Sequence, residues 1–347
     1  MNTITGRTPI SWAAGEGRYE TLELLLQMRT AKPNKQDWDG RTPLSWAAGN
    51  GHNRNVELLL EHPGVPPQAD LADNQGRTPF WWAAANGHIA VVRGLLQRDD
   101  ISLNLNASNN LNQTPLLCAA MMQEVELLRV LLQQPEINLN AQDMRLRTAV
   151  SWAAQAGYLT IVELLLGLSG TDANIPDQLG RTPLCFAAES GRDSVVGYLL
   201  QRGDINPNTA DNVGQTPLLY AAVNGHDATI QRLLEREDIN PNVQCSVGKT
   251  ALWVAAYCGH NHVVEQLLER EDVNPNVWDN RGRTPVTQAG ICGHEQVVRL
   301  LLGRADININ IRDNEGHTAI EHCLQAGQGR VWRLLLEWQA GNQDPQF

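Results

Sequence analysis

The side chains of this chain that could carry out chemistry lie close together near its C-terminal end. His317, Glu321 and His322 fall within six residues, and Gln288 and Cys292 are expected nearby. Imidazoles, carboxylates and thiols can bind a metal ion or act as acid–base catalysts. Glu321 and His322, however, are neighbours on a predicted helix and point about 100° apart, and His317 lies on a turn. Because these side chains do not converge, we expect no metal site and no cofactor. We keep the three residues only as catalytic candidates.

No motif of a known enzyme class accompanies these side chains. The chain contains none of the patterns G-x-S-x-G, P-loop, H-E-x-x-H or protein kinase. Five of its nine His belong to a recurring Gly-His pair at the start of a predicted helix, where we expect a helix cap rather than a ligand. A polar terminal unit that caps a stack is the alternative explanation for the C-terminal group.

The elements that would position these groups follow from a sequence repeat. A Thr opens nearly the same phrase ten times, and successive Thr are 34 or 36 residues apart. A period of this length indicates a solenoid of stacked units. We number each unit from its Thr as position 0; the ten are Thr8, Thr42, Thr78, Thr114, Thr148, Thr182, Thr216, Thr250, Thr284 and Thr318.

Each unit predicts two helices and a turn. Pro follows the Thr in seven units, so the Thr is expected to cap a helix that begins at the Pro. Paired Ala at positions +5 and +6 form one face of this helix, and a Gly at +9 ends it. Apolar residues such as Val91, Val92 and Leu95 then recur with helical spacing. A loop that often reads Asn-Pro-Asn leads to an Asp-x-x-Gly turn before the next Thr.

The phrase G-R-T-P-L-S-W-A-A, clearest at Gly40–Ala48, resembles the ankyrin repeat, as do the Gly-His pair and the Leu-rich second helix. The resemblance runs from about Gly6 to Gly341. It implies an all-α solenoid of helix-turn-helix units with extended turn tips, curved around a concave groove. It also implies protein recognition as the commonest use. The family's usual His at position +3 is missing from every unit, which leaves open the hydrogen bonds between repeats that it would make.

We expect a single array over residues 1–347. Its units begin near Gly6, Gly40, Gly76, Asn112, Leu146, Gly180, Gly214, Gly248, Gly282 and Gly316.

Position +4 carries an aromatic side chain in six of the ten units, on the helix face opposite the paired Ala. An exposed apolar strip usually marks an interaction site, and Trp and Tyr often anchor interfaces. The alternative is that these rings pack on one another and only stiffen the array. On the first hypothesis the binding residues are Trp12, Trp46, Trp81, Trp82, Met121, Met122, Trp152, Phe186, Tyr220 and Tyr257.

The turn before each Thr adds charge beside this strip. An Arg occupies position −1 in six units, and Trp38 lies in one of the turns. The Arg could hold an acidic partner, but we favour pairing with the Asp of the turn that precedes its helix. The Arg at −1 are Arg7, Arg41, Arg77, Arg147, Arg181 and Arg283.

The fourth and fifth units depart from the pattern. Asn112 and Leu146 replace the turn Gly, and Gln123-Glu124 replaces the Gly-His pair. Two Met occupy positions +7 and +8 of the fourth unit, and Met-rich surfaces adapt to varied partners. Drift in a tolerant repeat is the alternative explanation. The predicted floor of a binding groove is Trp82, Met121, Met122 and Trp152.

Composition limits the compartment and the partners. The net charge of −11 argues against nucleic acid, and no apolar run approaches the length of a membrane span. The six Cys include no C-x-x-C pair, and the N-terminal residues 1–5 lack the apolar segment of a signal peptide. We therefore expect free thiols, a reducing compartment and an intracellular location, cytoplasmic or nuclear.

Two functions agree with these features. We favour a scaffold or adaptor that holds a partner protein or peptide in its groove, as a monomer and without membrane contact. The alternative is an enzyme or small-molecule binder that uses the aromatic strip as a cradle and the polar C-terminal units as its reactive end. A third hypothesis makes the chain an adaptor domain of a larger protein.

Overall fold

The computed structural model describes residues 5–63, 65 and 68–342. These residues form twenty helices and no strand. The predicted absence of a signal peptide concerns residues 1–5, of which residues 1–4 lie outside the described part. Of the described helices, none is long and apolar enough to cross a membrane.

Each repeat contains two helices, as the sequence predicts. The first helices are α1 (Pro9–Gly15), α3 (Pro43–Gly49), α5 (Pro79–Ala85), α7 (Pro115–Met121), α9 (Ala149–Ala156), α11 (Pro183–Glu189), α13 (Pro217–Asn224), α15 (Ala251–Cys258), α17 (Pro285–Cys292) and α19 (Ala319–Gln325). The second helices are α2 (Tyr19–Leu26), α4 (Asn53–Glu61), α6 (Ile89–Leu96), α8 (Val125–Leu131), α10 (Leu159–Leu166), α12 (Asp193–Leu200), α14 (Asp227–Leu234), α16 (Asn261–Leu268), α18 (Glu295–Leu302) and α20 (Gly329–Gly341).

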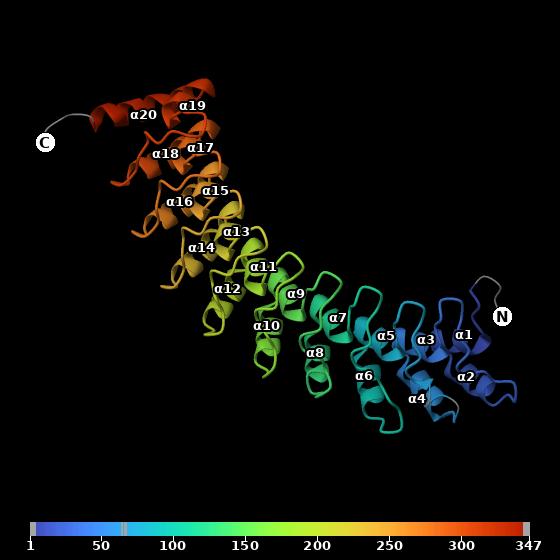
Figure 1. Ribbon diagram of the computed structural model, residues 1–347. Helices are drawn as coiled ribbons and strands as arrows, with labels where there is room; N and C mark the ends of the chain where they lie inside the picture. The colour runs from blue at the N-terminus through green and yellow to red at the C-terminus, as the bar shows by residue number, and fades with distance from the viewer. Residues whose placement is uncertain (1–4, 64, 66–67, 343–347) are drawn as a thin grey trace. The chain divides into compact units, whose positions relative to one another are not determined.

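Contacts divide the chain into two compact units. Unit 1 comprises Met1–Ala153 and Thr160–Ile175, and unit 2 comprises Ala154–Leu159 and Pro176–Phe347. Within unit 1 the helices α1, α3, α5 and α7 pack side by side in one row, and α2, α4, α6 and α8 form a second row (Figure 1). The odd-numbered helices α11 to α19 and the even-numbered helices α12 to α20 form the same two rows within unit 2.

The Thr at position 0 caps the first helix in every repeat. The Oγ1 atom of Thr42, for example, accepts the backbone N–H of Ser45 at 3.1 Å, and Pro43 occupies the first helical position. This bond satisfies one of the four N–H groups that a helix N-terminus leaves unpaired. The prediction of a Thr cap followed by Pro is confirmed.

The interior is built from small and branched apolar side chains. The paired Ala47 and Ala48 are fully buried, as are Val91, Val92 and Leu95 of a second helix. Ala at the contact between first helices lets the helices approach closely, and the branched residues fill the space between the rows. The predicted helical stripes therefore face the interior.

The Gly-His pairs join consecutive repeats. Gly51 has a φ of 74°, and a Cβ atom on it would lie 2.7 Å from Nδ1 of His88 in the next repeat. The Nε2 atom of His88 is hydrogen-bonded to the carbonyl oxygen of Gly49 at 3.0 Å. The His is the N-cap residue of its helix, as predicted, but its side chain makes no cap bond there and reaches back to the preceding repeat instead.

The Asn-Pro-Asn loops form a second set of connections. The side chain of Asn208 donates to the carbonyl oxygen of Asp238 at 2.7 Å and accepts the N–H of Asn240 at 2.7 Å. Asn242 makes the same two bonds to Asp272 and Asn274. These loops thus hold adjacent repeats in register.

Candidate functional site

The turn before each first helix, positions −5 to −1, is called the tip turn. In the turn Asp37–Arg41 the N–H of Asp37 donates to the carbonyl oxygen of Arg41 at 3.0 Å. The Oδ1 atom of Asp37 accepts the N–H groups of Asp39 and Arg41 at 3.1 and 2.8 Å. The Gly at −2, here Gly40, has a φ of 80°, a conformation that L side chains rarely adopt.

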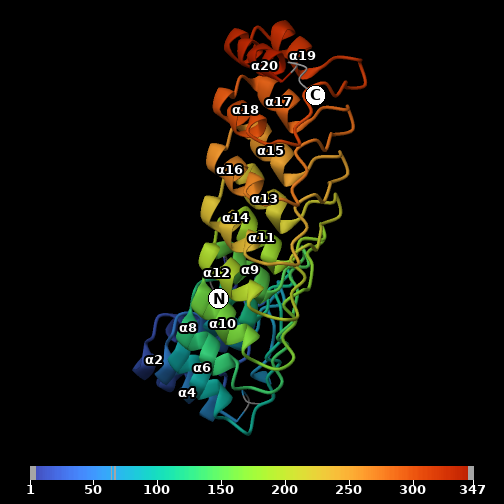
Figure 2. The same ribbon diagram turned by 90° about the vertical axis from the view of Figure 1, so that its left-hand side faces the viewer.

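Neighbouring tip turns are bonded to each other within each unit. The N–H of Asn280 donates to the carbonyl oxygen of Val247 at 3.1 Å, and the N–H of Ser246 donates to that of Val213 at 2.8 Å. Figure 2 shows the tip turns of unit 2 projecting as one row, beyond the odd-numbered helices and away from the even-numbered ones. Each unit therefore presents an ordered edge of backbone turns.

In four repeats the aromatic side chain at position +4 is hydrogen-bonded to the Asp of its own tip turn. Nε1 of Trp46 donates to Oδ2 of Asp37 at 2.8 Å. We call this the Asp–aromatic bond, and it fixes each ring against its own repeat. The same bond joins Trp82 to Asp73 at 3.1 Å, Trp152 to Asp143 at 3.1 Å, and Tyr220 to Asp211 at 2.7 Å.

The Arg at −1 lies against these rings. The guanidinium carbon of Arg7 is 3.7 Å from the Trp12 ring centroid and 3.9 Å from that of Trp46. Arg41 lies 3.6 Å from Trp46 and 3.9 Å from Trp82 in the same way. We call this alternation the Trp–Arg stack. The alternative in which the rings pack on one another is therefore wrong for these repeats, because an Arg separates each pair.

Burial affects the electrostatics of the stack. It lowers the pKa of Arg41 to about 10, with the charge of Arg77 acting in the same direction, so Arg41 stays protonated at neutral pH. The negative faces of two indoles offset part of the cost of burying this charge. Burial also raises the pKa of Tyr220, and its bond to Asp211 and the charge of that carboxylate raise it further. Both groups therefore keep the protonation state that their contacts require.

Farther along the chain the Arg pairs with the tip-turn Asp, as we favoured from the sequence. Arg77, Arg147 and Arg181 lie 2.8, 3.1 and 2.9 Å from the Oδ2 atoms of the Asp in their own turns. Where Phe186 offers no donor, Arg181 takes the Asp177 carboxylate with both Nε and Nη2. Three of the six predicted acid-binding Arg are thus already paired with a carboxylate of their own turn.

The rings at +4 are less exposed than an open aromatic strip requires. Trp12 is 39% exposed, whereas Trp46, Trp82, Trp152 and Tyr220 are half-buried. Arg side chains stack on the faces of the three half-buried Trp, and the bonded Asp lies at the donor atom of each ring. The predicted strip is therefore a structural column with partly accessible edges.

Two predicted binding residues are out of solvent reach. Phe186 is fully buried and Trp81 is 6% exposed. Trp81 lies at +3, where its Nε1 atom donates to the carbonyl oxygen of Gln113 in the next tip turn at 2.7 Å. Trp253 makes the equivalent bond to Arg283 at 2.8 Å. In these repeats Trp makes a bond between repeats from the position of the missing His, so we remove Phe186 and Trp81 from the candidate surface.

The irregular fourth and fifth repeats have the same backbone conformation as the regular repeats. Asn112, Gln123 and Leu146 adopt the left-handed conformation, with φ of 56°, 59° and 61°, where the pattern has Gly. Met122 is 64% exposed, and Met121 is half-buried beside the amide of Gln113. A binding role for the two Met stays a prediction, while the rings of Trp82 and Trp152 are held by their own Asp.

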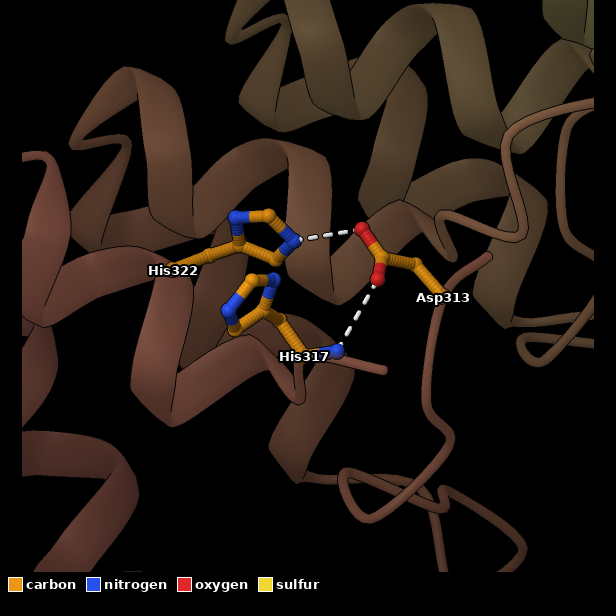
Figure 3. Close-up of side chains that lie close together, drawn as sticks. All are labelled: Asp313, His317 and His322. Atoms are coloured by element: carbon orange, nitrogen blue, oxygen red, sulfur yellow. Dashed lines mark hydrogen bonds and ion pairs between the residues drawn. The ribbon is translucent and has the colours of Figure 1, made fainter. Parts of the chain in front are cut away.

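The C-terminal candidates divide into two groups, and Figure 3 shows the one formed by His317 and His322 around Asp313. His322 occupies position +4, and its Nε2 atom donates to Oδ2 of Asp313 at 2.6 Å. The N–H of His317 donates to Oδ1 of the same Asp at 3.0 Å, and the two imidazole rings lie 5.3 Å apart. Glu321 instead accepts the N–H of Thr318 at 2.6 Å and completes a capping box at the start of α19.

The Asp313–His322 pair has the geometry of an Asp–aromatic bond. Burial alone would raise the pKa of Asp313, but the N–H of His317, the His322 side chain and the N–H of Glu315 together lower it to about 2. Ligand atoms of Asp313, His317 and His322 lie within 4.8 Å of one another. Arg283, whose Nε is 3.6 Å from Asp313 Oδ2, already supplies a cation there. The arrangement therefore gives His322 the structural role that Trp46 has near the N-terminus.

Tyr257 is the most exposed of the predicted aromatic residues, at 47%. Its ring stacks on that of Trp253, with centroids 5.7 Å apart. Nζ of Lys249 lies 4.3 Å from the Trp253 ring and 5.8 Å from the Tyr257 ring. Tyr257 thus presents an apolar face beside a cation.

A set of exposed apolar side chains lies at the tip turns, and our sequence analysis named only Trp38 and Leu146 of it, neither as a binding residue. Each member is between 45% and 62% exposed and projects from a bonded turn. The signal was visible as apolar residues inside the turns that precede the repeat Thr, where polar residues are usual. We call these residues the tip row: Trp38, Leu111, Met144 and Leu146 in unit 1, and Leu179, Val213 and Val247 in unit 2.

Comparison with known families agrees with the repeat analysis. A family model of three consecutive ankyrin repeats matches residues 1–70, 65–143, 102–169, 150–245, 226–313 and 252–346. These matches together cover nearly the whole chain. Among curated proteins, none matches the chain significantly.

Proposed function

The chain belongs to the ankyrin repeat family, whose repeats are generally protein–protein interaction modules, and we propose that it is a scaffold or adaptor that holds a partner protein or peptide. In unit 1 the proposed surface combines the tip-row residues with Trp12, Met122 and the half-buried Met121. In unit 2 it combines the tip-row residues with Tyr257. The edges of the half-buried rings at +4 border this surface.

The tip row is the observation that supports the proposal. Exposed apolar side chains normally occur singly on a protein surface, and a contiguous set marks an interaction site. Here Leu179, Val213 and Val247 occupy the same position of three consecutive turns, and each of the three is about half exposed. Because the turns are joined by backbone hydrogen bonds, a partner would meet them already ordered and would lose little entropy in binding.

Charge supports the class of partner. The net charge of −11 opposes the phosphates of nucleic acid, and apolar tip residues suit an apolar protein surface. We further propose that the chain forms one continuous array and works as a monomer inside the cell, where its six Cys stay reduced.

The test is capture of partners by the full chain and by two variants. The tip variant carries Leu179→Ser, Val213→Ser and Val247→Ser. The control carries Leu24→Ser, Met28→Ser and Leu324→Ser, which remove apolar groups that are at least as exposed but lie away from the tip turns. We expect proteins captured from native lysate by the wild type and the control to be lost at least about tenfold from the tip variant. Equal capture by all three would contradict the proposal.

A further inference from the structure

A pocket of about 430 Å³ lies in unit 2, between the tip turn Asp279–Arg283 and the helices α15 and α17. Lys249, Trp253 and Tyr257 line one side, and Arg281, Arg283 and Gln288 lie among the residues of the other. Pockets of this size accommodate a small ligand or a few side chains of a peptide.

The pocket forms where the repeat pattern is broken. In the eighth repeat Cys245 replaces the tip-turn Asp and Val254 replaces the aromatic residue at +4. In the ninth repeat Gln288 occupies +4, where its amide lies 3.7 Å from the Cys292 sulfur. Neither repeat can therefore form an Asp–aromatic bond, and the volume that a ring fills elsewhere is left open.

The same changes leave cations without their usual partners. Lys249 at −1 has no carboxylate in its own turn, because that position is Cys245. Within the described part of the chain no ion pair involves Lys249 or the exposed Arg281. Arg283 forms an ion pair with Asp313 of the next repeat, with its Nε atom 3.6 Å from Oδ2. The carboxylate of Asp279 is engaged by the backbone, because its Oδ1 atom accepts the N–H groups of Arg281 and Arg283. Three cations and one carboxylate thus line this pocket in a chain of net charge −11.

Apolar surface adjoins these cations. Val247 of the tip row lines the pocket and is 49% exposed, and the ring of Tyr257 is 47% exposed beside Lys249. A ligand held here would contact positive charge and an aromatic face together. It would also contact the tip row, because Val247 belongs to both the row and the pocket lining.

We propose that this pocket receives an acidic segment of the partner protein, with a carboxylate between Lys249 and Arg281 and a neighbouring apolar side chain against Tyr257 and Val247. The inference rests on the proposed function and specifies the chemistry of the partner. Charge complementarity selects the acidic segment, because a basic or neutral peptide would leave Lys249 and Arg281 unpaired.

The probe is a fluorescent peptide with the central sequence Glu-Leu-Glu-Leu-Glu between Gly-Ser flanks, measured by fluorescence anisotropy with the full chain at about 0.15 M salt. We expect it to bind the wild type and to bind Arg281→Glu and the double variant Lys249→Glu/Arg281→Glu at least about tenfold more weakly. The matched control, Arg299→Glu/Arg330→Glu, changes the net charge equally on α18 and α20 and should bind like the wild type. Arg281 is exposed, so the single variant keeps the fold.

The inference would be overturned by no binding of the acidic peptide, by equal binding of its Gln-Leu-Gln-Leu-Gln counterpart, or by equal loss in the control variant. Displacement of the peptide by inorganic phosphate at equal ionic strength would also contradict it, since a simple anion site needs no apolar neighbour. If capture still depends on the tip row while the peptide fails, the pocket inference fails and the proposed function stands. If the peptide binds but the tip variant captures partners as well as the wild type does, the proposed role of the tip row fails and the pocket inference stands.

Discussion

The Asp–aromatic bond makes a quantitative prediction about Trp46 and Asp37. The Nε1–Oδ2 distance is 2.8 Å, and the side chain of Asp37 is buried. A hydrogen bond to a buried charged acceptor stabilises a fold by about 1.5–3 kcal/mol. Trp46→Phe removes the donor, and Asp37→Asn places an amide where Oδ2 accepted the indole N–H. We therefore expect a double-mutant cycle to give a coupling energy of about 2 kcal/mol.

The assay combines urea unfolding with amide hydrogen exchange in α1 to α5, because a repeat array can unfold from one end and global unfolding would hide a local loss. The control cycle pairs Asp37→Asn with Trp38→Phe, an exposed Trp in the same turn, and its coupling should stay within about 0.5 kcal/mol. A coupling below about 0.5 kcal/mol for the Trp46 cycle would refute the view that the rings at +4 are held by their own turns.

Three further predictions concern other parts of the chain. Hydrogen bonds lower the pKa of Asp313 from 3.8 to about 2, so its ionised carboxylate adds about 2 kcal/mol to the free energy of unfolding above pH 4. This contribution is lost as the pH falls from about 4 to 2. Urea midpoints followed by circular dichroism should show this loss in the wild type and not in Asp313→Asn; an unchanged pH slope in the variant would contradict the assignment. Leu146→Gly should raise stability by about 0.5–1 kcal/mol, because Leu is strained at a φ of 61° whereas Gly is not; a lower urea midpoint would contradict this. Iodoacetamide should modify the exposed Cys258 in the native protein and spare Cys118, Cys185 and Cys323, since burial raises their thiol pKa to about 12, 11 and 12. Early labelling of any of these three, read by peptide mass spectrometry, would show that their repeats open.

The fold could be predicted because each signal in the repeat acts locally. Thr42 and Pro43 set the start of a helix, Ala47 and Ala48 set its buried face, and Gly51 sets its end, all within ten residues. Such short-range preferences do not depend on how the rest of the chain is arranged. Their recurrence then determined the stacking.

The environment of the aromatic column could not be read from a helical wheel. The wheel placed Trp46 opposite the paired Ala, but its exposure depends on Asp37 and Arg41, which a separate turn brings over the ring. One signal was present in the sequence. Every repeat whose ring at +4 can donate a hydrogen bond has an Asp at −5, wherever both positions are described. The eighth repeat lacks both the ring and the Asp, since it has Val254 and Cys245 at these positions.

The C-terminal candidates show the same limit. Spacing alone brought His317, Glu321 and His322 together, whereas the structure assigns Glu321 to a helix cap and His322 to Asp313. The partner of His322 lies nine residues away, in the tip turn, and only the comparison with Trp46–Asp37 identifies its role.

Hydrogen exchange of the full chain, alone and with a protein recovered by capture, tests the central claim that recognition uses the tip turns. The account predicts slower exchange on binding in the turns 177–181, 211–215, 245–249 and 279–283, with the second helices α12 to α18 unchanged. Protection confined to the second helices, with the tip turns exchanging as in the free chain, would contradict it.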